Sequence, residues 1–128
     1  MIDNELLTVI KQMHSKFGIS NDKQTLLSEE EKTFRVACLK EEIREFEESE
    51  TMADSIDALI DLCVFAIGTV ERMGCLEIFE ECFKRVMTAN MSKSIGNATK
   101  EREGTKSFQL DLVKPVDFKA PNFDDLIR

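Results

Sequence analysis

Acidic residues at helical spacing stand out between residues 40 and 62, where the chain reads KEEIREF and, after a short polar connection, ADSIDALIDL. If the two segments are consecutive helices, their carboxylates point at each other on the apolar sides. Carboxylates that are buried together are costly unless a cation compensates their charge. The stretch therefore predicts a cation site made by Glu41, Glu42, Glu45, Asp54, Asp57 and Asp61.

The first of these segments carries its acids on an apolar side. At about 100° per residue, Glu41 and Glu45 share an arc with the apolar residues at positions 34, 37 and 38, and Glu42 lies beside them. Lys40 and Arg44 fall on the opposite side. A solvated acidic face is the alternative interpretation, and this placement counts against it.

The second segment is apolar around almost its whole circumference from residue 56 to residue 70, as in a helix that is buried on all sides. Its acidic exceptions, Asp54, Asp57 and Asp61, fall within about 60° of arc. No lysine or arginine shares their register, so a bound divalent cation is the simplest compensation. Protonated or solvated carboxylates with a structural role are the alternative.

The register of the two helices gives a further expectation. With a connection centred near residues 49 and 50, an antiparallel hairpin pairs residues whose numbers sum to about 100. The expected pairs are Glu45 with Asp54, Glu42 with Asp57, and Glu41 with Asp61. Carboxylate oxygens favour Mg²⁺, or Mn²⁺, over zinc, and Mg²⁺ keeps coordination places for water and phosphate.

The elements that must position these acids are all helical. Apolar periodicity, a capping box formed by Ser28 and Glu31, and stops at Gly18 and Gly74 predict an all-α four-helix bundle with short connections. One short strand is expected near residues 108–113 in an otherwise irregular tail. We expect a single domain over residues 1–128, with a helical core at about 4–93 and a wrapping tail at 94–128. The expected helices are 4–17, 28–48, 52–73 and 75–91.

The composition restricts the kinds of partner that the protein can bind and the cellular compartment in which it is expected. The net charge of −8 argues against nucleic acid or an anionic membrane as a general partner. Basic residues outnumber acids between residues 84 and 119, which suits a bound metal together with an anion. The four cysteines form no CxxC pair and are expected as buried thiols. Without a leader or a spanning segment, the protein is expected to be soluble and cytoplasmic.

An EExxE motif on one helix, followed by spaced aspartates in an apolar run on the next, resembles the all-α nucleoside triphosphate pyrophosphohydrolases, the MazG-like and phosphoribosyl-ATP pyrophosphohydrolase-like superfamily. The resemblance extends over FRVACLKEEIREF, DALIDLCVFAIGT, RVMTANMSK and KPVDFKAPNF, and ANMSK is typical of a small single-domain branch. It implies Mg²⁺-dependent hydrolysis of a (deoxy)nucleoside triphosphate to the monophosphate and pyrophosphate.

The resemblance also implies roles for particular residues. The metal carboxylates are Glu42 and Glu45, with Glu41 as the first acid of the motif, and Asp57 and Asp61 on the next helix. The second motif is usually ExxD, and here the chain departs from it. Either Asp54 replaces the glutamate or, if Asp61 ends the motif, Ala58 does.

The substrate contacts are expected from several parts of the chain. Glu41 or Glu42 is expected to orient or deprotonate the attacking water. Basic and amide groups after residue 84 suit phosphate oxygens, although cations also stabilise a helix C-terminus and tail lysines are often solvated. Near the end of the first helix, a histidine and a phenylalanine could line a base pocket, with core packing as the alternative. The candidates are Arg85, Asn90, Lys93, Lys106, Lys114, His14 and Phe17.

Several readings of the whole chain stay open. We expect a homodimer or a homotetramer, because the apolar helix suggests packing between subunits. A dUTPase-like or dCTP-preferring enzyme and a phosphoribosyl-ATP pyrophosphohydrolase share the same chemistry. A non-catalytic helical bundle that binds a metal or a nucleotide is the alternative from another class.

Overall fold

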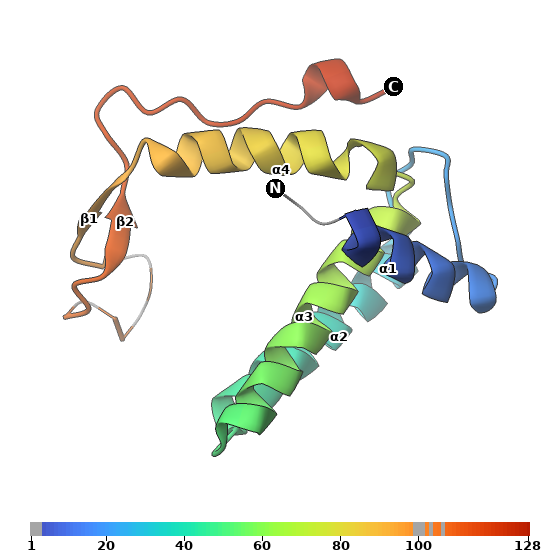
Figure 1. Cartoon of the computed structure of the whole chain (residues 1–128), viewed down its shortest axis with the longest axis horizontal. Helices are drawn as coiled ribbons and strands as arrows, with labels where there is room; N and C mark the ends of the chain where they lie inside the picture. Colours follow the sequence, from blue (N-terminus) through green and yellow to red (C-terminus); the bar gives the residue numbers. More distant parts are fainter. Residues whose placement is uncertain (1–3, 99–101, 103, 106) are drawn as a thin grey trace. The chain divides into compact units, whose positions relative to one another are not determined.

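The computed structural model describes residues 4–98, 102, 104–105 and 107–128, and its fold is all-α with four helices, as the sequence predicted (Figure 1). None of the helices in these residues is both long enough and apolar enough to cross a membrane. The elements in chain order are α1 Asn4–Lys16, α2 Glu29–Glu48, α3 Met52–Arg72, α4 Leu76–Met91, β1 Ser94–Gly96, β2 Asp111–Val113 and the 3₁₀ helix η1 Asp124–Leu126.

The chain divides into two compact units, Met1–Phe79 and Glu80–Arg128, with the boundary inside α4. The sequence had placed a boundary between core and tail later, after residue 93. That both parts form one domain stays a prediction. The candidate carboxylates all belong to the first unit.

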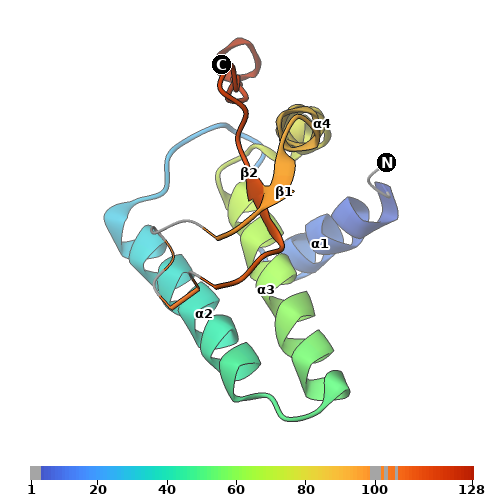
Figure 2. The same ribbon diagram turned by 90° about the vertical axis from the view of Figure 1, so that its left-hand side faces the viewer.

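Within the first unit, α2 and α3 form an antiparallel hairpin and lie side by side in both views (Figures 1 and 2). The helix α1 packs against α3, where Gly68 makes room for it. A Cβ atom at Gly68 would lie 2.9 Å from Nε2 of His14, closer than such atoms approach each other. The absence of a side chain at Gly68 therefore lets His14 of α1 pack directly on α3.

Local signals fix where the helices begin and end. The hydroxyl of Ser28 accepts a hydrogen bond from the backbone N–H of Glu31 at 3.1 Å, and Thr51 caps α3 through the N–H of Asp54 in the same way. After α3, Gly74 has a φ of +70°, and a Cβ there would lie 2.1 Å from the carbonyl oxygen of Lys23. Only glycine fits this stop.

The prediction that α3 is buried on all sides is wrong for the single chain. Ile56 and Ile60 are 53% and 56% exposed, and Leu59 is exposed as well. Cys63 continues the same stripe and is exposed, although all four cysteines had been expected in the interior. The physical reason is that α2 and α1 cover only part of the circumference of α3. The uncovered stripe is an apolar surface on the outside of the chain.

In the second unit, β1 and β2 pair antiparallel, with Ile95 opposite Leu112. The strand β2 confirms the strand expected near residues 108–113, whereas the partner β1 was not predicted. With three residues, β1 is too short to show an alternating pattern. The C-terminal segment is joined to α4 by Arg85, which binds both carboxylate oxygens of Asp125 at 2.6 and 3.0 Å.

Candidate metal and nucleotide site

Three glutamates of α2 come together in the half of the helix that is nearer its connection to α3. Glu41, Glu42 and Glu45 each offer one carboxylate oxygen, and these oxygens lie within 4.8 Å of one another. Glu42 is only 6% exposed, whereas Glu41 and Glu45 are exposed. The EExxE spacing therefore does place its acids together, with the middle one in the interior.

The environment of Glu42 disfavours its charged form. Desolvation is the largest cause, followed by a side-chain hydrogen bond with Glu45 and by the negative charges of Glu45, Asp61 and Glu41. Together they raise the pKa of Glu42 from 4.5 to about 7. A cation is expected to bind beside Glu42, because a positive charge would stabilise the carboxylate form that the surroundings of this residue disfavour.

The possible metal-ligand atoms of this cluster suit a hard divalent cation. All are carboxylate oxygens, and Oε2 of Glu42 is buried without a hydrogen-bond partner among the described residues. Among the residues that the structure describes, no lysine or arginine forms an ion pair with Glu41, Glu42 or Glu45. Mg²⁺ or Mn²⁺ prefers such oxygens and would provide the missing positive charge.

The register between α2 and α3 differs from the predicted one. The hydroxyl oxygens of Ser49 and Ser55 lie 2.6 Å apart, so facing residues have numbers that sum to 104 rather than to about 100. At the other end of the hairpin, Glu31 pairs with Arg72, which gives a sum of 103. The chain thus slides by about one helical turn. The local reason is the extended connection, in which Ser49 and Thr51 cap the adjoining helix ends.

This register decides which aspartate faces the glutamates. Asp61 is close enough for its charge to raise the pKa of Glu42, although Asp57 had been expected opposite Glu42. Asp54 and Asp57 are exposed, and neither belongs to the group of acids whose oxygens converge. The predicted pairs of Glu45 with Asp54 and of Glu42 with Asp57 are therefore wrong. With Asp61 at the end of the second motif, the buried Ala58 occupies the position of its glutamate.

The two candidates for a base pocket on α1 lie in different surroundings. His14 is 2% exposed and sits in the interior against Gly68 and Arg35. Its burial and the charge of Arg35 lower the pKa of its imidazole. Phe17 is 65% exposed, with the ammonium of Lys16 5.5 Å from its ring centroid. Neither side chain lines the pockets of this unit that are described below.

The basic candidates of the second unit separate into two groups. Arg85 is engaged with Asp125 and with the carbonyl oxygen of Asn122, which leaves it less available for phosphate. Lys93 and Lys114 both lie over the ring of Phe118, at 5.6 and 5.1 Å from its centroid. These two lysines, 21 positions apart in sequence, are thus brought together by the fold.

For two further candidate phosphate contacts, Asn90 and Lys106, the structure gives little evidence. Asn90 is half-buried near the end of α4, and its backbone carbonyl accepts a hydrogen bond from the N–H of Lys93 at 3.1 Å. Lys106 lies outside the described residues, so its expected contact with a triphosphate stays a prediction.

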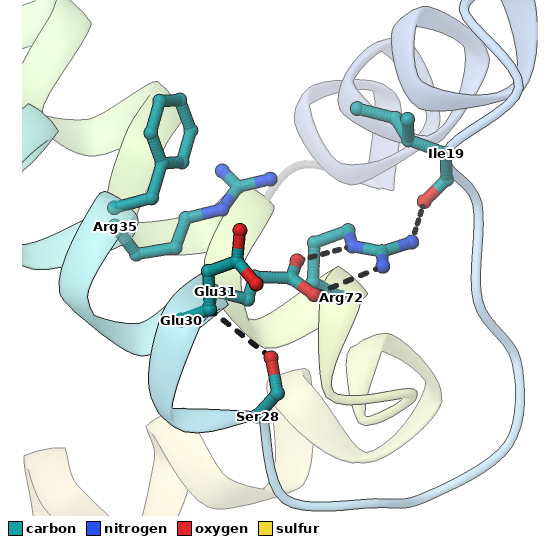
Figure 3. A pocket seen from close by; sticks show the side chains of 7 residues that line it. Ile19, Ser28, Glu30, Glu31, Arg35 and Arg72 are labelled. Carbon is teal, nitrogen blue, oxygen red and sulfur yellow. Dashed lines mark hydrogen bonds and ion pairs between the residues drawn. The ribbon is translucent and has the colours of Figure 1, made fainter.

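One buried arginine had not been singled out from the sequence. Arg35 is 8% exposed, and its Nε has no hydrogen-bond partner in the part of the chain that the structure describes. It lines a pocket of about 500 Å³ near the start of α2 (Figure 3). Arg35 also lines a second pocket of about 300 Å³, together with several apolar side chains. The available signal was spacing, because Arg35 precedes Glu42 by seven positions and therefore shares its face of α2.

The chain matches one known family over most of the segment described above. Residues 10–90 match a family model described as phosphoribosyl-ATP pyrophosphohydrolase. This segment includes the three clustered glutamates, Asp61 and Arg35. No curated protein matches the chain.

Proposed function

The chain belongs to the phosphoribosyl-ATP pyrophosphohydrolase family, within the MazG-like all-α pyrophosphohydrolase superfamily, and from this premise we propose which nucleotide it cleaves. The family makes it a pyrophosphohydrolase, a hydrolase that acts on the acid anhydride of a nucleotide. The proposed reaction converts a (deoxy)nucleoside triphosphate to the monophosphate and pyrophosphate. The observation that carries the proposal is the convergence of Glu41, Glu42 and Glu45 around a buried carboxylate.

The metal in this proposal is Mg²⁺, with Mn²⁺ as a substitute. Glu42 and Glu45 would hold it, and Asp61 would contribute from α3, because its charge already acts on Glu42. Bound there, the ion would neutralise charge on the phosphates and on the leaving pyrophosphate. Asp54 and Asp57 have no part in this arrangement, since both are exposed outside the cluster.

The attacking water is assigned to Glu41. Its carboxylate is exposed, so substrate and water can reach it, and it lies within the same group of oxygens as Glu42. Glu41 would accept a proton as the water oxygen bonds to the α phosphorus. The bond between the α phosphorus and the bridging oxygen then breaks, and pyrophosphate leaves with that oxygen.

A second candidate substrate is phosphoribosyl-ATP, and the description of the matching family favours it. Its triphosphate would undergo the same cleavage, because the chemistry lies at the same anhydride. The two candidates differ in the base, which carries a second phosphoribosyl group in phosphoribosyl-ATP. A common carboxylate site is therefore compatible with either substrate.

The test is a pyrophosphate-release assay with Mg²⁺ over canonical and modified triphosphates, together with phosphoribosyl-ATP. We expect pyrophosphate from at least one triphosphate and no orthophosphate. Activity on phosphoribosyl-ATP alone would favour the second candidate. Release of orthophosphate would show that another anhydride bond is cut. No product from any substrate would favour a bundle that binds a metal or a nucleotide without catalysis.

The assembly that we propose is a homodimer or a homotetramer. The exposed stripe of Ile56, Leu59, Ile60 and Cys63 on α3 is an apolar surface that packing between subunits would remove from water. A second copy of the chain is its proposed partner. Light scattering coupled to size-exclusion chromatography should give two or four times 14.6 kDa, and Ile60→Glu should shift it toward one chain. A wild-type monomer would disprove this assembly.

A further inference from the structure

The pocket beside the start of α2 has an unusual balance of charge. Two arginines and two glutamates line it, and Arg72 is already paired with Glu31 at 2.6 and 3.1 Å. Arg35 and Glu30 provide the other two charges of the lining (Figure 3). The net charge of the lining is therefore zero. Such a pocket does not select an anion such as free phosphate.

Arg35 is the group in this lining that most needs a partner. It is buried to more than nine-tenths, and no described residue provides a hydrogen-bond acceptor for its Nε. An N–H group left in this state is costly, because the donor has lost water without gaining an acceptor. The planar set of donors of Arg35 fits two acceptor atoms side by side. A ligand for this pocket should therefore present such an edge.

The rest of the lining favours a flat, uncharged ligand. Phe34 is 60% exposed and Ile19 is 38% exposed, so both offer apolar surface to the pocket. An aromatic ring provides a stacking face for a heteroaromatic base. Glu30 adds a carboxylate that can accept from N–H donors. The pocket volume of about 500 Å³ leaves room for a base and part of its sugar.

The pocket also lies at a suitable place relative to the carboxylate cluster. Arg35 and Glu42 are both buried on the same face of α2, seven residues or about 10 Å apart along the helix axis. The interval between the carboxylates that would hold the phosphates and Arg35 is one that a ribose can span. The base of the nucleotide would then reach Arg35.

We propose that this pocket is the base-binding subsite and that it selects a 6-oxopurine. This inference rests on the proposed function. The O6 and N7 atoms of guanine or hypoxanthine would accept from Arg35, and N1–H would donate to Glu30. Adenine carries an amino group at C6, so two donors would face each other there. A site that leaves a buried donor unpaired discriminates strongly against such a base.

The test compares inosine and adenosine nucleotides, which differ in this oxo or amino group. Calorimetry with IMP and AMP in EDTA measures the subsite without the metal, and pyrophosphate release from ITP and ATP measures it during turnover. We expect the wild type to prefer the inosine nucleotide about tenfold or more in both measurements. In Arg35→Met, the preference should disappear.

Two further variants make this result specific. Arg44→Met removes an exposed arginine on the solvent side of the same helix and should keep the wild-type preference. Glu30→Gln changes an exposed residue, so it should fold even if Arg35→Met does not, and it should reduce the preference. Circular dichroism of each variant establishes that it is folded.

The outcomes separate the subsite from the reaction. Equal binding of IMP and AMP, or a preference that survives in Arg35→Met, would overturn the subsite. So would inorganic phosphate that binds as tightly as IMP, because the pocket would then be an anion site. If IMP binds through Arg35 but no triphosphate is cleaved, the subsite stands and the proposed function fails. If ITP and ATP are cleaved equally, the function stands and the subsite fails.

Discussion

Glu31 and Arg72 form an ion pair 2.6 Å long between the start of α2 and the end of α3, although they are 41 positions apart in sequence. Each side chain is 26% exposed, and the pairing lowers the pKa of Glu31 and raises that of Arg72. The contact holds the register that brings Asp61, rather than Asp57, to Glu42. The backbone N–H of Glu31 takes part in the cap of α2, whereas its carboxylate forms a tertiary contact with Arg72.

The first prediction concerns this ion pair. Arg72→Met should lower the free energy of unfolding by about 1–2 kcal/mol, because a partly buried charge-assisted contact is lost and the carboxylate of Glu31 loses its partner. Urea unfolding monitored by circular dichroism measures the change. The exposed Arg44→Met is the matched control and should stay within about 0.5 kcal/mol. Equal effects of the two substitutions would contradict a role for the pair in stability.

The second prediction concerns catalysis. Glu42→Gln should lower pyrophosphate release about 100-fold or more, because a neutral amide cannot replace the carboxylate beside the metal. The control is Glu50→Gln, which changes an exposed acid in the connection between α2 and α3. It should retain the wild-type rate. The role of Glu42 would be disproved by equal rates in the two variants.

The third prediction concerns pH. In EDTA, the pKa of Glu42 is about 7 in the folded protein and 4.5 in the unfolded chain. The folded state therefore favours the protonated acid, and this contribution is fully present below pH 4.5 and is lost as the pH rises through 7. The free energy of unfolding should fall between pH 5 and pH 8 in the wild type. Glu42→Gln should show a smaller fall, and Mg²⁺ should restore stability at pH 8. If wild type and Glu42→Gln show the same dependence of unfolding free energy on pH, Glu42 does not cause the fall in stability.

The fourth prediction separates the aspartates of α3. Asp61→Asn should weaken Mg²⁺ binding about tenfold or more, because its charge acts on Glu42, whereas Asp54→Asn and Asp57→Asn should change it little. Titration calorimetry with Mg²⁺ alone provides the measurement. If Asp57→Asn weakens binding more than Asp61→Asn does, the metal is held in the register first expected from the sequence.

The fifth prediction concerns the lysines beside Phe118. If Lys93 and Lys114 contact the phosphates, the double substitution to methionine should raise KM about tenfold with little change in kcat, because binding is lost equally in the ground and transition states. Lys119→Met changes an exposed lysine of the same segment and serves as the control. An unchanged KM in the double variant would leave the two lysines with a structural role at Phe118.

Most of the fold could be predicted from sequence signals that act locally. The apolar period of α1 to α4, the hydroxyl of Ser28 and the glycine at position 74 act within a few residues of themselves, so the helix ends could be predicted closely. The strand β1 escaped prediction because its pairing partner lies beyond position 110. Its three residues gain their structure from that pairing and not from their own pattern.

The site was predictable in part for the same reason. Glu41, Glu42 and Glu45 share one helix, so their convergence follows from helical geometry alone. Arg35 was overlooked because a single arginine in an apolar pattern is usually exposed, with its stem packed along the surface. Its Nη1 atom lies next to Gly68 of α3, 33 positions away, so its burial depends on how α2 packs on α3.

By itself, the sequence determined the four helices, the three glutamates on one face of α2 and the family to which the chain belongs. Tertiary structure decided that Asp61 faces Glu42 and that Asp54 and Asp57 lie outside the cluster. The physical reason is that a helix fixes the direction of each side chain locally, whereas the register of two helices depends on the connection between them and on contacts such as that of Glu31 with Arg72. A slide of one turn leaves every helix intact and changes which acids meet.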